Sequence, residues 1–226
     1  DLARAVKFRG SGFFANGEPV LANRRVYPGQ TVSFELPPEG EGVAPQPEIP
    51  VNVVYEDAFA VVLEKPPHLA VHPTLNYPYD TLANGYAAWA AQQGISPVFR
   101  PVNRIDKDTS GLLVVAKDDA THIGLSQQMA VHSVERAYRT IVYGGFAQDE
   151  GFVESNLGRS KTDRKKMAVY PASEPHTKYA YTGYQVLERL NNFTMLECRL
   201  KTGRTHQIRV HMASIQHPVA GDPVYG

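Results

Sequence analysis

One charged segment of the chain carries residue types that suit catalysis. Asp106 follows Arg104 by two residues, and Thr109-Ser110-Gly111 separates this pair from the apolar segment 112–116. Hydroxyl side chains bond nearby backbone and glycine permits positive φ, so the segment predicts a rigid turn leading into a buried strand. Catalytic groups concentrate on loops that a strand holds in place. Asp106 is therefore the leading candidate for a reactive group.

Three further segments combine basic, aromatic and histidine side chains. They are EKPPHLAVHP at 64–73, RAYRTIVYG at 136–144, and LKTGRTHQIRVHM at 200–212, which HPVAGDP follows at 217–223. Taken in order with 100–111, they resemble the motifs of the RluA-type RNA pseudouridine synthases over roughly residues 50–226. Four motifs in the expected order are more specific than any single pattern. The resemblance implies an enzyme that isomerises uridine in RNA to pseudouridine, on the α+β fold of that family.

The resemblance also assigns the central roles. Asp106 is the essential carboxylate, and it acts either as nucleophile at C1′ or as base at C2′. Arg209 pairs with Asp106, because an aspartate in a dry pocket needs a cationic partner to stay ionised. Tyr138 stacks on the target base, which must leave the RNA stack to reach the site. The reaction involves no net redox change, so no metal or other cofactor is expected.

Several other residues are candidates for binding RNA or the detached base. Arg104 and Arg204 suit phosphate or base contacts, since the guanidinium is a planar fork of donors. Leu200 is expected to line the pocket floor, and His206 to contact the RNA or base. The basic residues Arg164, Lys165 and Lys166 belong to a cluster at 159–166 that is expected to grip phosphates.

Composition restricts the class of protein less tightly. The chain has 226 residues, 42% of them hydrophobic, and a formal net charge of zero, so it can bury a full core. A polyanionic partner therefore needs local segregation of charge, which the chain has: residues 35–57 are acidic and 159–166 basic. RNA is the expected partner, and the default oligomeric state is a monomer.

The single cysteine and the hydropathy pattern favour a cytoplasmic protein. Cys198 cannot form an intramolecular disulfide, and no apolar run approaches the ~20 residues of a membrane helix. His68 and His72 lie in a proline-flanked segment, while His206 and His211 are five residues apart, so neither spacing brings two histidines to one helix face. The sequence therefore predicts no membrane span and no metal site.

The order of elements predicts an α+β fold, a mostly antiparallel mixed sheet with flanking helices. Residues 1–36 read as a partial S4-like, β-rich RNA-binding segment, 37–50 as a linker rich in proline, glycine and glutamate, and 51–226 as the catalytic domain, expected to be truncated at its C-terminus. Helices are predicted at 81–93, 119–131 and 205–215. Strands are predicted at 51–55, 60–64, 112–117, 134–143, 166–170, 178–188 and 192–200.

Other functions remain open on these residues alone. A non-catalytic RNA-binding module on the same scaffold is the main alternative, although such a module has no use for a carboxylate beside RNA phosphates. A base-releasing glycosidase needs a second catalytic carboxylate, and Asp108 reads as a turn residue. The S4-like start favours ribosomal RNA as substrate, with transfer RNA as the second candidate.

Overall fold

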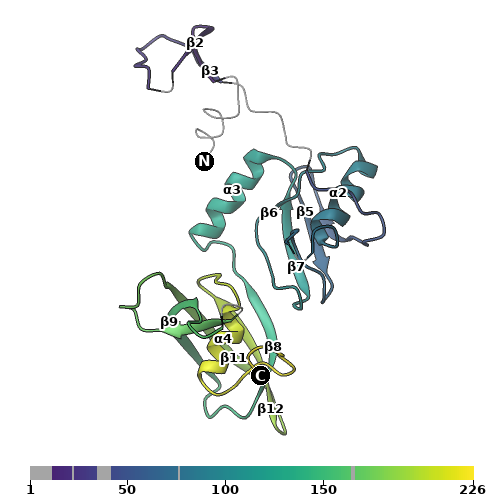
Figure 1. Cartoon of the computed structure of the whole chain (residues 1–226), viewed down its shortest axis with the longest axis vertical. Helices are drawn as coiled ribbons and strands as arrows, with labels where there is room; N and C mark the ends of the chain where they lie inside the picture. The colour runs from purple at the N-terminus through teal and green to yellow at the C-terminus, as the bar shows by residue number, and fades with distance from the viewer. Residues whose placement is uncertain (1–11, 22, 35–41, 76, 164–165) are drawn as a thin grey trace.

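Three antiparallel sheets organise the chain in the computed structural model (Figure 1), which describes residues 12–21, 23–34, 42–75, 77–163 and 166–226. The predicted α+β class is confirmed, and all named strand pairs are antiparallel. Within the described residues, no helix is long and apolar enough to cross a membrane.

The first sheet is small and lies at one end of the molecule, apart from the other two (Figure 1). It has the order β2-β1-β3, with β1 at Phe13–Ala15, β2 at Glu18–Val20 and β3 at Val32–Phe34. An Asn-Gly turn joins β1 to β2, with φ of 52° at Asn16 and 83° at Gly17. The helical part of an S4-like segment would fall on residues 1–11, outside the described residues.

The linker predicted at 37–50 is described only from residue 42, and it contains no helix or strand from there to residue 50. It packs on the helix α2 (Leu82–Gln93), whose Asn84 donates to the carbonyl of Ala44 at 2.8 Å. A side chain at Gly85 would meet the carbonyl of Ile49 at 2.8 Å, so glycine is needed for this close approach.

The second sheet has the order β4-β5-β7-β6 and carries the predicted catalytic loop. Its strands are β4 (Asn52–Glu56), β5 (Ala60–Lys65), β6 (Arg100–Pro101) and β7 (Gly111–Ala116). Alternate residues of β5 and β7, such as Leu63 and Leu113, are fully buried with Tyr86 of α2. The helix α3 (Asp119–Ala130) follows, and Asp118 caps it by accepting from the N–H of Thr121.

The third sheet has the order β10-β9-β11-β12-β8 and carries the remaining motifs. Its strands are β8 (Ala137–Tyr143), β9 (Glu150–Arg159), β10 (Met167–Tyr170), β11 (Lys178–Leu190) and β12 (Phe193–Leu200). The helix α4 (Gln207–Ser214) lies against β9, β10 and β11. Cys198 is buried in the core with Met212 of α4 and Leu196.

The predicted helices and strands match the observed ones closely, but the sequence did not predict the two-residue strand β6 or the longer strand β9. Its sequence, EGFVESNLGR, holds two glycines and several polar residues and has weak strand propensity. Pairing with β10 on one side and β11 on the other stabilises it instead. Sheet context therefore overrides local preference in this segment.

Candidate active site

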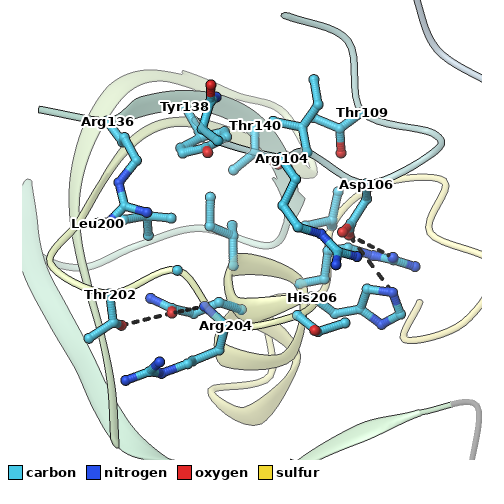
Figure 2. Close-up of a pocket in the computed structure, with 18 of the residues that line it drawn as sticks. Arg104, Asp106, Thr109, Arg136, Tyr138, Thr140, Leu200, Thr202, Arg204 and His206 are labelled. Atoms are coloured by element: carbon cyan, nitrogen blue, oxygen red, sulfur yellow. Dashed lines mark hydrogen bonds and ion pairs between the residues drawn. The ribbon is translucent and has the colours of Figure 1, made fainter. Parts of the chain in front are cut away.

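A pocket of about 790 Å³ opens between the second and third sheets. Its walls come from the β6–β7 loop, the end of α3, strand β8, the segment from Leu200 to Arg209, and the turn at Val219–Pro223. The three motifs with the strongest chemical character therefore meet in one cavity, although about 100 residues separate Asp106 from Arg209. Figure 2 shows their side chains converging from different elements.

The loop that carries Asp106 is fixed by contacts on both sides. Ile105 is buried, and the N–H of Thr109 donates to the carbonyl of Asp106 at 3.2 Å. Asn103 donates to the carbonyl of Leu112 at 3.1 Å and accepts from the N–H of Val114 at 2.9 Å, so its amide binds the loop to β7. The observed contacts come from the Asn103 amide, the buried Ile105 and a backbone N–H; rigidity of the loop stays a prediction.

A buried lysine supports the same loop from β5. The Nζ of Lys65 donates to the carbonyls of Pro66 at 2.7 Å and Lys107 at 2.8 Å, and the residue is fully buried. Burial lowers the pKa of Lys65 to about 8, while Asp108 and Asp106 act in the opposite direction. A cation thus lies beneath the turn that presents Asp106.

Arg209 forms ion pairs with two carboxylates. Its Nη1 donates to Oδ2 of Asp106 at 3.1 Å, so the predicted ion pair is present. On its other side, Nε and Nη2 donate to Asp222 at 2.6 and 2.9 Å. We call these three residues the Asp–Arg–Asp triad. Because the Asp222 side chain is only 3% exposed, this second pair is the better shielded one.

The pKa values of Asp222 and Arg209 favour their ionised forms. Burial acts to raise the pKa of Asp222, but hydrogen bonds from Arg209, Val224 and Tyr225 outweigh it and hold that pKa below its usual range. Hydrogen bonding to Asp222, and less strongly to Asp106, raises the pKa of Arg209. Arg209 thus stays cationic at any working pH.

Two buried polar side chains hold α4 so that Arg209 faces the pocket. Gln207 accepts from the hydroxyl of Thr202 and the N–H of Arg204, and donates to Tyr181 and Thr182 of β11. His211 lies 2.9 Å from the Thr182 hydroxyl and 3.1 Å from the hydroxyl of Ser155 on β9. Burial lowers its pKa to about 4.

Tyr138 lies on β8 and lines the pocket together with Leu200 of β12 (Figure 2). It packs against both the core of the second sheet and that of the third. Burial raises the pKa of its phenol, so the ring is neutral and presents a π face.

The predicted RNA-binding residues differ in how they are placed. Arg104 is exposed and points into the pocket (Figure 2), with no hydrogen bond or ion pair to any described residue. Arg204 lines the pocket, but its Nε donates to the carbonyl of Tyr179 at 2.9 Å. His206 also lines the pocket, with Nε2 at 3.9 Å from Oδ2 of Asp106.

The basic cluster at 159–166 does not line this pocket in its described part. Lys166 donates its backbone N–H to Asp163 at 3.0 Å, in the turn between β9 and β10. Arg164 and Lys165 lie outside the described residues.

The histidines considered as metal ligands make other contacts. His68 pairs with Asp108 at 2.9 Å, and His72 packs edge-on against Phe99. Across the described ranges, no three histidine, cysteine, aspartate or glutamate side chains gather as a metal site.

Sequence reasoning missed three residues of the site: Lys65, Asp222 and Arg136. Lys65 lies in the motif at 64–73 and Asp222 in the motif at 217–223. A charged residue among apolar or turn residues was the only sign that either side chain is buried. Arg136, two residues before Tyr138, lines the pocket with a buried Nε that has no hydrogen-bond partner among the described residues. Its guanidinium lies against Gly203, and no sequence pattern near Arg136 predicts this contact.

Comparison with known proteins gives a consistent result. The sequence pattern of the RNA pseudouridylate synthase family matches residues 60–214. An uncharacterized RNA pseudouridine synthase of Bacillus subtilis, YlyB, is 44% identical over 93% of this chain and 69% of its own length. Ribosomal large subunit pseudouridine synthase D of Zymomonas mobilis is 47% identical over 87% of this chain and 62% of its own length.

A solved structure shares the fold. The human RNA pseudouridylate synthase domain containing 1 protein superposes with a TM-score of 0.65 at 24% identity, over 84% of this chain and 73% of that one. The chain spans between about half and about two thirds of the length of the first curated relatives that it matches.

Proposed function

Because this chain belongs to the RNA pseudouridylate synthase family, we propose that it converts specific uridines of RNA to pseudouridine with Asp106 as the essential carboxylate. The observation that carries the proposal is the ion pair between Asp106 and Arg209, in a pocket that Tyr138 also lines. The pair places a carboxylate and a guanidinium together inside the cavity.

The reaction exchanges one bond to C1′ for another. The C1′–N1 bond breaks and its electron pair leaves with the base, while Asp106 either attacks C1′ or removes a proton from C2′. The base rotates, and C5 forms a bond to C1′ as the aspartate departs or C2′ regains its proton. C5 loses its proton and N1 gains one, so the atoms balance and no cofactor or metal is required.

The pocket residues divide the remaining work. Tyr138 stacks on the base, which suits a ring that must turn in its own plane. Leu200 limits access of water, which would otherwise trap the sugar and release the base. Arg104 contacts a phosphate of the flipped nucleotide, because its guanidinium has no protein partner among the described residues and faces the pocket. Arg204 contacts the phosphate backbone of the same RNA.

We place the substrate in ribosomal RNA of the large subunit. Support comes from relatives named ribosomal large subunit pseudouridine synthase D, which are 37–47% identical to this chain. Residues 1–36 then act as an S4-like RNA-binding segment joined by the 37–50 linker to the catalytic domain. The basic cluster with Arg164, Lys165 and Lys166 holds the flanking RNA, and the enzyme works in the cytoplasm as a monomer.

The test compares wild type, Asp106→Ala and Asp106→Asn on transcribed large-subunit ribosomal RNA and on transfer RNA. Tritium release from C5-labelled uridine reports the reaction, and mapping of pseudouridine reports the site. We expect release and one defined set of sites for wild type on ribosomal RNA, and neither for the two variants. Since Asn keeps the volume of Asp, its inactivity would assign the role to the charge.

Two results would contradict the proposal. RNA binding without tritium release by wild type would favour a non-catalytic RNA-binding module. Release that persists at the wild-type rate in Asp106→Asn would show that another group carries the chemistry.

A further inference from the structure

His206 lies in an unusual position beside Asp106. Its backbone is left-handed, with φ of 55°, at the residue that caps the N-terminus of α4. Such a conformation is uncommon for residues other than glycine and is found at functional sites, where surrounding contacts hold it. It turns the imidazole toward the pocket, and Figure 2 shows the ring directed at Asp106.

The two ring nitrogens of His206 have different surroundings. Nδ1 lies 2.8 Å from the hydroxyl of Tyr225, and Nε2 faces the pocket at 3.9 Å from Oδ2 of Asp106. Tyr225 packs edge-on against the imidazole and also lies against the guanidinium of Arg209. The ring is therefore fixed on one side and open to substrate on the other.

The contacts of Tyr225 favour one of the two neutral tautomers of His206. The backbone N–H of Met167 donates to the Tyr225 hydroxyl oxygen at 2.8 Å. With one acceptor position occupied, the hydroxyl has its single proton available for Nδ1 of His206, and in the tautomer that uses this proton Nδ1 is the unprotonated nitrogen. In that neutral tautomer the proton resides on Nε2, as an N–H donor aimed at the pocket.

Several contacts keep the ring neutral. Burial lowers the pKa of His206; Asp106 and Asp222 oppose this effect, whereas Arg209 and Arg159 add to it. The N-terminus of α4 also disfavours a cation at this position. A neutral donor is thus present at physiological pH.

We propose that the Nε2–H of His206 donates a hydrogen bond to a carbonyl oxygen of the uracil as it leaves C1′. This inference rests on the proposed function. When the C1′–N1 bond breaks, the electron pair stays with the base, and the negative charge is shared by N1 and the carbonyl oxygens. A fixed donor beside Asp106 stabilises that charge without transferring a proton, for both the nucleophile and the base route.

The role predicts a dependence on the leaving group. Fluorine at C5 makes the uracil anion more stable, so a substrate with 5-fluorouridine at the target site needs less help from a donor. The rate is measured on both substrates as the single-turnover loss of the N1-linked nucleoside, detected by mass spectrometry of digested RNA. The variants are His206→Ala, His206→Gln, Tyr225→Phe and the control His122→Ala on α3.

We expect His206→Ala to slow the reaction of uridine about 100-fold, the usual effect of losing one such donor, and that of 5-fluorouridine clearly less. His206→Gln, which keeps an N–H near the Nε2 position and bears the same backbone strain as alanine, should recover part of the rate. Tyr225→Phe keeps the ring packing but removes the hydroxyl beside Nδ1, so the imidazole of His206 can adopt either neutral tautomer. This variant should lose less rate than His206→Ala, with unchanged RNA affinity.

Other results would overturn the inference. Equal losses on uridine and 5-fluorouridine in His206→Ala, or no recovery in His206→Gln, would indicate a structural role. A wild-type rate in His206→Ala would show that the donor is not used. Activity of wild type and of His122→Ala on uridine tests the proposed function separately, so failure of one is distinguishable from failure of the other.

Discussion

At the scale of single residues, the site depends on how charge is compensated. Arg209 serves two carboxylates, and the buried pair with Asp222 fixes its guanidinium by two hydrogen bonds while one bond reaches Asp106. Asp222 touches no reacting atom in this arrangement, since Arg209 stands between it and Asp106. It is a positioning residue, and its removal should affect both folding and rate.

Asp222→Asn should destabilise the protein by about 3 kcal/mol near neutral pH, because it leaves part of a shielded cation uncompensated. The folded-state pKa of Asp222 is lowered, so its stabilisation is present above the unfolded pKa of ~3.9 and is lost as the pH falls through the folded pKa. Urea unfolding measured from pH 7 to pH 3 should therefore show that the difference in unfolding free energy between variant and wild type becomes smaller in acid. A constant gap would assign the loss to packing.

The same variant should slow catalysis about 100-fold, since a small displacement of a catalytic group costs about that much. The expected signature is a lower single-turnover rate with unchanged RNA affinity. An unchanged rate would mean that Asp106 alone keeps Arg209 in place.

Tyr138 offers a second test at this scale. Tyr138→Phe keeps the ring and should retain a rate close to wild type. Tyr138→Ala removes the ring and should react more slowly, because the base loses a stacking interaction of ~1–3 kcal/mol. Single-turnover rates under saturating enzyme distinguish the two. If phenylalanine is as slow as alanine, the hydroxyl and not the ring face is the functional group.

At the scale of elements, helix α4 brings Arg209 of the last motif to Asp106, which lies on a loop of the second sheet. Its orientation depends on buried polar contacts to β11 and β9, through Gln207 and His211, together with the apolar packing of the helix. Polar contacts of this kind specify one orientation, because few others satisfy every donor and acceptor.

His211 should make the stability of the protein fall in mild acid. Its folded pKa is about 4, below the ~6.5 of an unfolded histidine, so the unfolded chain takes up a proton first as the pH falls. Stability should decrease by about 2–3 kcal/mol between pH 7 and pH 4 on this account. His211→Gln removes the titration, and its urea-unfolding free energy should depend less steeply on pH than that of wild type, even if it is lower at pH 7. Parallel pH profiles would contradict this assignment.

Much of this level was predictable from sequence. The strands β4 and β5, the helices α2, α3 and α4, and the loop before β7 follow from hydrophobic periodicity and from capping and turn residues. Strand β9 did not, because its strand propensity is weak and its pairing with β10 and β11 is visible only in the folded sheet. Lys65 and Asp222 were missed for a related reason: a buried charge is recognisable only once its partners, 42 and 13 residues away for the bonds described, are brought together.

At the scale of the whole molecule, the net charge of zero conceals a segregated distribution. The stretch at 35–57 holds six acidic and no basic residues, whereas the stretch at 159–166 holds five basic residues and one acidic residue. An RNA substrate responds to the local field, so the basic cluster should determine much of the affinity while the pocket determines the reaction.

The triple variant Arg164→Ala/Lys165→Ala/Lys166→Ala should weaken RNA binding and reduce its salt dependence. Each lost phosphate contact lowers the slope of log K against log salt by about 0.7–0.9. Binding titrations at several salt concentrations measure this slope. The control Arg189→Ala removes a guanidinium that pairs with Asp149 at 2.6 Å and does not line the pocket. An equal effect of both variants would show that the response is non-specific.

The division of the site between two sheets has a consequence for the safety of the substrate. Asp106 belongs to the second sheet, while Arg209 and Asp222 belong to the part built on the third. A molecule in which only one sheet has folded holds a carboxylate without its counter-charge, or a cation without its carboxylate. On the proposed function, neither half alone should cut a glycosidic bond. Base detachment should then require the same assembly that allows reattachment, and we expect a partly folded chain to leave no abasic sites in RNA.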